Sequence, residues 1–123
     1  MLLCSCNEKA IVENSSQILA VKWKFSEHGK NEWHSAQVPG LVHLDLWENQ
    51  LIEDPYFEQN EQKQRWIENK DWTYQTTFNL SETQLNAQNI ELDFKGLDTY
   101  AKVFLNDSLI LEANNMFRSW QVD

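Results

Sequence analysis

The segment Asp54–Lys70 carries the side chains best suited to bind a ligand. Trp66 lies there among polar residues, where its flat indole can stack on the C–H side of a sugar ring. Its neighbours Asn60, Glu61 and Arg65 can hydrogen-bond to hydroxyl groups. In the other interpretation, Trp66 packs this segment against the body of the protein. Both interpretations stay open, and the four residues are the candidate substrate-binding residues.

Carboxylates are the second source of chemistry, because the chain contains 19 Asp and Glu residues. Glycoside hydrolysis by a retaining enzyme needs two carboxyl groups about 5–5.5 Å apart. Spacing in the sequence selects no such pair. Glu61 follows an asparagine in a polar loop, where a carboxylate is usually only solvated. We therefore assign no catalytic residue to this chain.

Metal, nucleophile and phosphate chemistry have no support in the sequence. The three histidines, His28, His34 and His43, lack the spacing of metal ligands, and we expect surface or capping roles for them. Serine lies in no Gly-x-Ser-x-Gly motif. The 3 glycines are too few for a phosphate-binding loop. The sequence thus predicts neither a metal nor another cofactor.

The composition is that of a folded protein with an acidic surface. A length of 123 residues predicts one domain, and 41% hydrophobic with 24% charged residues is ordinary for a globular chain. The net charge of −9 would repel phosphate backbones and anionic bilayers. We therefore do not expect a nucleic-acid partner.

The N-terminal residues 1–17 suggest a processed leader. Apolar and small residues followed by cysteine resemble the lipobox of bacterial lipoproteins, in which the final cysteine, here Cys6, becomes the lipidated residue. We expect a signal remnant and linker here, and a periplasmic or outer-membrane-associated lipoprotein. An incidental apolar N-terminus is the alternative. Elsewhere the sequence has no apolar run near the ~20 residues that span a bilayer.

Alternating apolar and polar residues predict several half-buried strands. The alternation is clear after the polar segment, where Trp72, Tyr74 and Phe78 share one face. The expected strands are Ile18–Phe25, Trp33–Val38, Trp72–Phe78, Ile90–Phe94, Ala101–Leu105 and, after a hairpin turn at Asn106-Asp107, Leu109–Ala113. One short helix is expected over Val42–Ile52, after the Pro39-Gly40 turn, and Ser81–Asn89 reads as a polar connection with room for one helical turn.

These elements predict an all-β fold, an antiparallel sandwich or jelly roll formed by residues 18–123. Five or six strands would leave an apolar sheet edge unpaired. The last residues, 114–123, contain no closing turn. We therefore expect the jelly roll to be incomplete at its C-terminus.

A set of short motifs gives this fold a family resemblance. In order, they are Val38-Pro39-Gly40 with His43; Asp54, Tyr56 and Asn60; Arg65-Trp66-Ile67; Trp72 with Tyr74; Gly96-Leu97-Asp98-Thr99; and Asn115-Met116-Phe117. This ordered set resembles the N-terminal, galactose-binding-like domain of β-mannosidases in glycoside hydrolase family two. The resemblance covers nearly the whole chain from about Ile18 onward.

The resemblance implies a longer parent enzyme, in which immunoglobulin-like domains and a TIM barrel follow the jelly roll. The family's two catalytic glutamates, an acid/base and a nucleophile, lie on that barrel. The 123-residue chain alone is then expected to be inactive. By analogy, its loop from Asn60 to Trp72 would lean over the barrel mouth and help to enclose the terminal sugar.

The resemblance therefore implies an exo-acting, retaining hydrolase that releases terminal non-reducing β-D-mannose. The expected partners are β-mannoside oligosaccharides and the catalytic barrel of the same full-length chain, with membrane contact only through a lipid anchor. Two alternatives stay open. One is a stand-alone, non-catalytic carbohydrate-binding lipoprotein. The other is the N-terminal domain of another family-two exo-glycosidase, a β-galactosidase or β-glucuronidase.

Overall fold

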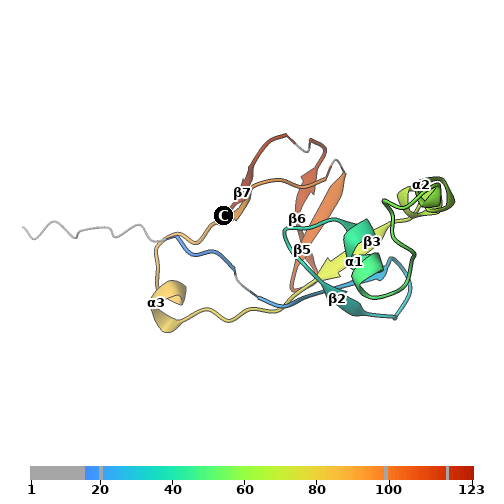
Figure 1. The fold of residues 1–123 in the computed structure, drawn as a ribbon. Helices are drawn as coiled ribbons and strands as arrows, with labels where there is room; N and C mark the ends of the chain where they lie inside the picture. Colours follow the sequence, from blue (N-terminus) through green and yellow to red (C-terminus); the bar gives the residue numbers. More distant parts are fainter. Residues whose placement is uncertain (1–15, 20, 99, 116) are drawn as a thin grey trace, which may run out of the picture. The chain divides into compact units, whose positions relative to one another are not determined.

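The computed structural model describes residues 16–19, 21–98, 100–115 and 117–123 (Figure 1). They fall into two compact units, one ending at Phe78 and one beginning at Asn79. Each unit has its own sheets. Residues 1–15, including Cys6, lie outside the described residues, as do Thr99 and Met116 of the motifs above.

The first unit is built on a three-stranded antiparallel sheet in the order β2-β1-β3. Its strands are β1 (Trp23–Glu27), β2 (His34–Ala36) and β3 (Trp72–Gln75). The register places Phe25 opposite both His34 and Tyr74. Residues paired across neighbouring strands point to the same face of a sheet, so the three rings form a row. Their centroids lie 6.0 Å (Phe25–His34) and 5.6 Å (Phe25–Tyr74) apart.

A short helix, α1 (Val42–Glu48), covers this face of the sheet. Leu46 of α1 packs with Phe25 and Ile67 in the buried core, and Trp72 and Tyr74 border that core. The helical spacing predicted for Val42–Ile52 is therefore confirmed, although the helix ends four residues earlier.

A buried carboxylate joins α1 to the sheet. Asp45 is only 1% exposed, and its Oδ2 accepts a hydrogen bond from the Tyr74 hydroxyl at 2.7 Å. Its Oδ1 accepts one from the Gln37 backbone N–H at 2.9 Å. The sequence pattern placed Asp45 in the helix but did not indicate that it is buried.

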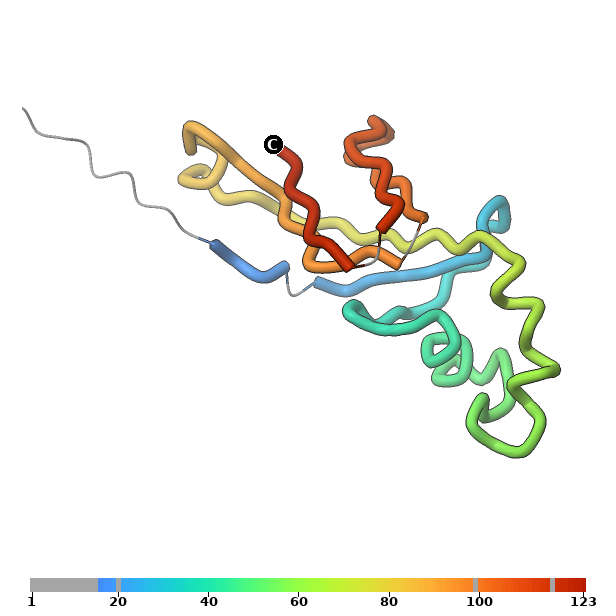
Figure 2. The backbone as a smooth tube through the Cα atoms, turned by 90° about the horizontal axis from the view of Figure 1, so that it is seen from above, coloured from blue at the N-terminus to red at the C-terminus, as the bar shows by residue number. Residues whose placement is uncertain are grey.

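Residues 49–71, which connect α1 to β3, form an excursion from the sheet, seen in green in Figure 2. It contains α2 (Asn60–Lys63) and the 3₁₀ helix η1 (Arg65–Asn69). The polar loop predicted for this segment therefore contains two short helices. These single turns are too short to show a helical period in the sequence, and side-chain amides hold them in place, as described below.

The second unit contains two two-stranded antiparallel sheets and a short helix, α3 (Glu82–Leu85). Strand β4 (Leu92–Phe94) pairs with β7 (Trp120–Val122), and β5 (Ala101–Leu105) pairs with β6 (Ser108–Ala113). Asn106 and Asp107, with φ of 47° and 66°, make the predicted two-residue turn between β5 and β6.

The structure corrects three details of the predicted elements. The first strand begins at Trp23 rather than Ile18, and β7 was not expected at all. The described residues form three short α-helices and one 3₁₀ helix, where one helix was expected. Ser81 caps α3 by accepting the Gln84 backbone N–H, which explains the helical turn in the predicted polar connection.

None of the described helices is long and apolar enough to cross a membrane. Nor do three or more His, Cys, Asp or Glu side chains gather as metal ligands within residues 16–19, 21–98, 100–115 and 117–123.

Candidate functional site

Three of the four candidate binding residues are exposed, and one is buried. Glu61 on α2 and Arg65 at the start of η1 are exposed. Trp66 follows Arg65 on η1 and is 42% exposed. Asn60, the first residue of α2, is buried.

Asn60 holds the excursion together. Its side-chain amide donates to the Asp54 backbone carbonyl at 3.0 Å. Gln64, which is also buried, donates in the same way to the Glu53 carbonyl at 2.8 Å. These bonds tie α2 and the start of η1 back to the chain that enters the excursion. Asn60 thus shapes the loop that carries the other three candidates, and its contact with a sugar stays a prediction.

Trp66 is positioned by the core behind it. Its ring lies 6.3 Å from the ring of Trp72, at an interplanar angle of 50°. The Trp72 indole N–H donates to the Ile67 carbonyl at 3.1 Å, which fastens η1 to β3. Since Ile67 is itself buried, η1 cannot easily shift, and the indole of Trp66 has a fixed support.

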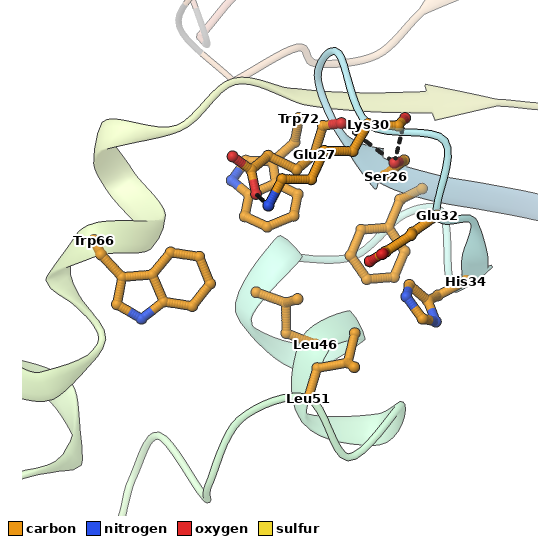
Figure 3. Close-up of a pocket in the computed structure, with 10 residues that line it drawn as sticks. Ser26, Glu27, Lys30, Glu32, His34, Leu46, Leu51, Trp66 and Trp72 are labelled. Carbon is orange, nitrogen blue, oxygen red and sulfur yellow. Dashed lines mark hydrogen bonds and ion pairs between the residues drawn. The ribbon is translucent and has the colours of Figure 1, made fainter.

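Trp66 faces a pocket of about 170 Å³, which we call the Trp66 pocket. Figure 3 shows its indole projecting from η1 toward the pocket, with Leu46 and Leu51 below it and Glu32 and His34 on the opposite side. The complete lining is Phe25, Ser26, Glu27, Lys30, Glu32, His34, Leu46, Leu51, Trp66 and Trp72. Trp66 thus lies beside Trp72 and also lines the pocket, so the structure is compatible with both interpretations of this residue.

An ion-pair cluster forms one rim of the Trp66 pocket. Glu27 lies 2.8 Å from the Lys30 Nζ and 3.3 Å from the Lys70 Nζ. The hydrogen bond with Lys30 is the main cause that lowers the pKa of Glu27; burial opposes it, and the hydrogen bond with Lys70 and the charges of both lysines lower the pKa further. The same pair raises the pKa of Lys30. The cluster joins the β1–β2 connection to the end of η1.

Glu32 and His34 form the other polar rim, and sequence reasoning missed both as binding candidates. Glu32 is exposed and His34 is half-buried. Within the part of the chain that the structure describes, neither side chain hydrogen-bonds to protein. They lie more than thirty residues before Trp66, and only the β2-β1-β3 order brings the two regions together. The sequence offered one signal for His34: the alternation around it predicted the strand, β2, that carries this ring.

The fold is that of a known class of domain. Residues 23–123 match the family model described as the glycosyl hydrolase 2 galactose-binding domain-like family, and the chain belongs to that family. This confirms the predicted all-β, galactose-binding-like fold class.

Two related proteins and one solved structure that resemble this chain are all named as β-mannosidases. Beta-mannosidase B of Aspergillus terreus is 42% identical over 111 residues, which cover 87% of this chain and 13% of that protein. Beta-mannosidase of Rattus norvegicus is 34% identical over 122 residues, covering 99% of this chain and 14% of that protein. The crystal structure of β-D-mannosidase from Dictyoglomus thermophilum superposes with a TM-score of 0.80 at 40% identity, covering 82% of this chain and 12% of that one. The chain thus spans about an eighth of the length of these relatives.

Proposed function

We propose that this chain is the N-terminal domain of a β-mannosidase, an exo-acting retaining glycoside hydrolase that releases terminal non-reducing β-D-mannose. The observation that carries the proposal is the identity of 42% and 40% to a fungal and a bacterial protein that are both named as β-mannosidases. Identity at that level over most of the chain supports a shared activity more strongly than a shared fold alone would.

In this proposal the domain shapes the substrate site and another part of the protein supplies the chemistry. The described carboxylates around the Trp66 pocket support that division. Glu27 is engaged by two lysines, which keep it ionised and unsuited to act as a general acid near neutral pH. Glu32 lies on the exposed connection between β1 and β2, in contact with solvent. The partner for catalysis would be a barrel domain of the same full-length protein.

The proposal is tested by assaying two proteins on an aryl β-mannoside. The full-length product of the reading frame that contains this chain should hydrolyse it, and should prefer it over the matching β-galactoside and β-glucuronide. The 123-residue chain alone should not. Turnover by the isolated chain would show that the catalytic pair lies within it. A full-length product that prefers the galactoside or glucuronide would identify another family-two enzyme, and one without any activity would favour a carbohydrate-binding protein.

The role of Trp66 is tested in the full-length protein. Trp66→Ala should raise KM or lower kcat while the folded fraction is unchanged, because the side chain is 42% exposed and lies outside the buried core. Trp47→Ala is the matched control, since Trp47 is 39% exposed and does not line the pocket. Equal kinetics for both variants would leave Trp66 with a packing role only.

We also propose that Cys6 is lipidated and anchors the protein in the periplasm or at the outer membrane. The support is the sequence around Cys6 alone. Cys6→Ser should move the protein from the membrane fraction to the soluble fraction. An unchanged distribution would refute the anchor and leave the β-mannosidase proposal untouched.

A further inference from the structure

The Trp66 pocket combines two kinds of surface that few ligands match. Part of its lining is aromatic, because Trp66 and Trp72 contribute to it at a ring separation of 6.3 Å. Another part is polar, with the carboxylate of Glu32 and the imidazole of His34 across from Trp66 (Figure 3). A suitable ligand needs an apolar face for the indole and hydrogen-bonding groups around its edge.

A pyranose ring has this combination. Its axial C–H bonds form an apolar face that stacks on an aromatic ring, and its hydroxyl groups point outward around the rim. Each hydroxyl can donate to the carboxylate of Glu32, and such charge-assisted bonds are among the stronger hydrogen bonds. The imidazole of His34 can donate or accept, according to its tautomer.

The size of the pocket fits one ring. Its volume of about 170 Å³ lies below the ~300 Å³ at which pockets for drug-sized ligands begin. One monosaccharide unit can therefore be held, and the rest of an oligosaccharide would extend into solvent through the open side.

Two other ligand classes fit less well. A cation would have to compete with the lysines at Glu27, whose Nζ atoms already lie at 2.8 and 3.3 Å. A wholly apolar ligand would cover Glu32 and His34 without giving either a hydrogen-bond partner, which costs free energy. A neutral polyhydroxylated ring avoids both penalties.

We propose that the Trp66 pocket binds a single hexopyranose unit, with Trp66 as the stacking platform and Glu32 and His34 as hydrogen-bonding partners of its hydroxyl groups. The identification of that unit as a β-mannosyl residue rests on the proposed function. The proposal replaces Glu61 and Arg65 as the polar partners of Trp66, because neither lines the pocket.

The test is a titration of the full 123-residue chain with methyl β-D-mannopyranoside, followed by the indole N–H signals of the ¹H–¹⁵N spectrum. The Trp66 signal, assigned with Trp66→Phe, should shift and saturate. Glu32→Gln should weaken binding about tenfold, or 1.4 kcal/mol, because one charge-assisted bond is lost. Trp66→Ala should weaken it at least as much.

Matched controls distinguish the pocket from non-specific effects. Trp47→Ala and Glu48→Gln change exposed side chains of α1 that do not line the pocket, so they should leave the affinity unchanged. The inference is overturned if the Trp66 signal does not move at saturating sugar, or if the controls weaken binding as much as the pocket variants. It is also overturned if Glu61→Gln or Arg65→Ala weakens binding while Glu32→Gln does not.

The same titration with methyl β-D-galactopyranoside separates this inference from the proposed function. A pocket that prefers the galactoside, with the same dependence on Trp66 and Glu32, supports the pyranose site and contradicts its assignment to mannose. A full-length protein without β-mannosidase activity contradicts the proposed function, whereas the titration result for the pocket would still stand.

Discussion

Replacing Tyr74 with Phe removes one hydrogen bond from the buried link between β3 and α1. The hydroxyl donates to Asp45 Oδ2 at 2.7 Å, and Asp45 is 1% exposed. The phenyl ring that remains can keep its stacking on Phe25, at a centroid distance of 5.6 Å. The variant therefore isolates the hydroxyl from the packing of the ring.

The size of the expected stability loss follows from the burial of Asp45 and from the hydrogen bonds to its two carboxylate oxygens. Its other oxygen keeps the Gln37 N–H at 2.9 Å, but Oδ2 loses its donor and is shielded from water. Hydrogen bonds to charged groups contribute about 1.5–3 kcal/mol, and a buried acceptor left unpaired costs a similar amount. We expect the free energy of unfolding to fall by about 2 kcal/mol.

The measurement is urea denaturation followed by tryptophan fluorescence, with the slope checked for constancy. Tyr56→Phe is the control, because Tyr56 is 76% exposed and its hydroxyl can bind water in either state. Its stability should be unchanged. A loss below about 0.5 kcal/mol in Tyr74→Phe would refute the argument that this bond secures α1 on the sheet.

The same link predicts a decline of stability in alkali. Burial, then the hydrogen bond with Asp45 and its charge, raises the pKa of Tyr74 above its ordinary value of 10.0. A raised pKa favours the protonated form in the folded state, so its contribution is complete below pH 10 and is lost as the pH rises further. Tyr74→Phe should remove this part of the pH dependence. Equal alkaline profiles for both proteins would contradict the assignment.

Three further changes test other contacts. Because the pKa of Glu27 is lowered, its contribution to stability should be lost as the pH falls below its ordinary value of 4.5, and Glu27→Gln should flatten the acid limb of a pH–stability profile. Trp72→Phe should cost about 1 kcal/mol in urea denaturation, because the Ile67 carbonyl loses its indole donor; an unchanged midpoint would contradict this. Gly40→Ala should cost about 1–3 kcal/mol, since a Cβ there would collide with the Gln37 carbonyl, and a fully stable variant would show that this turn can relax.

The sequence predicted those parts of the fold in which the pattern is local. Alternation placed Trp72 and Tyr74 on one face, and the structure has both bordering the core. The Asn106-Asp107 turn was also recognisable, because these residue types tolerate positive φ, which both adopt. In each case neighbouring residues alone determine the conformation.

Elements held by distant partners were missed. Strand β7 has three residues, and it forms only because Leu92 to Phe94 lie opposite Val122 to Trp120. The turns of α2 and η1 depend on the amides of Asn60 and Gln64, which bond to carbonyls several residues earlier. No periodicity in the segment itself records these contacts.

The candidate site was predicted in part for the same reason. Trp66 was recognisable as an aromatic residue in polar surroundings, and the structure has it bordering a pocket. Glu32 and His34 could not be recognised from the sequence as pocket residues, because their position opposite Trp66 depends on how β1 pairs with β2 and β3. Glu61 and Arg65 were selected because they lie near Trp66 in the chain; they do not line this pocket, and their contact with a sugar stays a prediction.

The support for Trp66 has a consequence for the proposed sugar site. The indole is held from behind by Trp72 and by the buried Ile67, whereas Glu32 belongs to the connection between β1 and β2. That connection contains Gly29, whose φ of +85° strains any other residue even though the space around it is open. Substitutions at the other positions of this connection would change the polar edge of the pocket and leave Trp66 and Trp72 in place. In the proposed sugar site, affinity for a ring would therefore depend on residues other than those that select among rings, and exchanging this connection between homologues would test that separation.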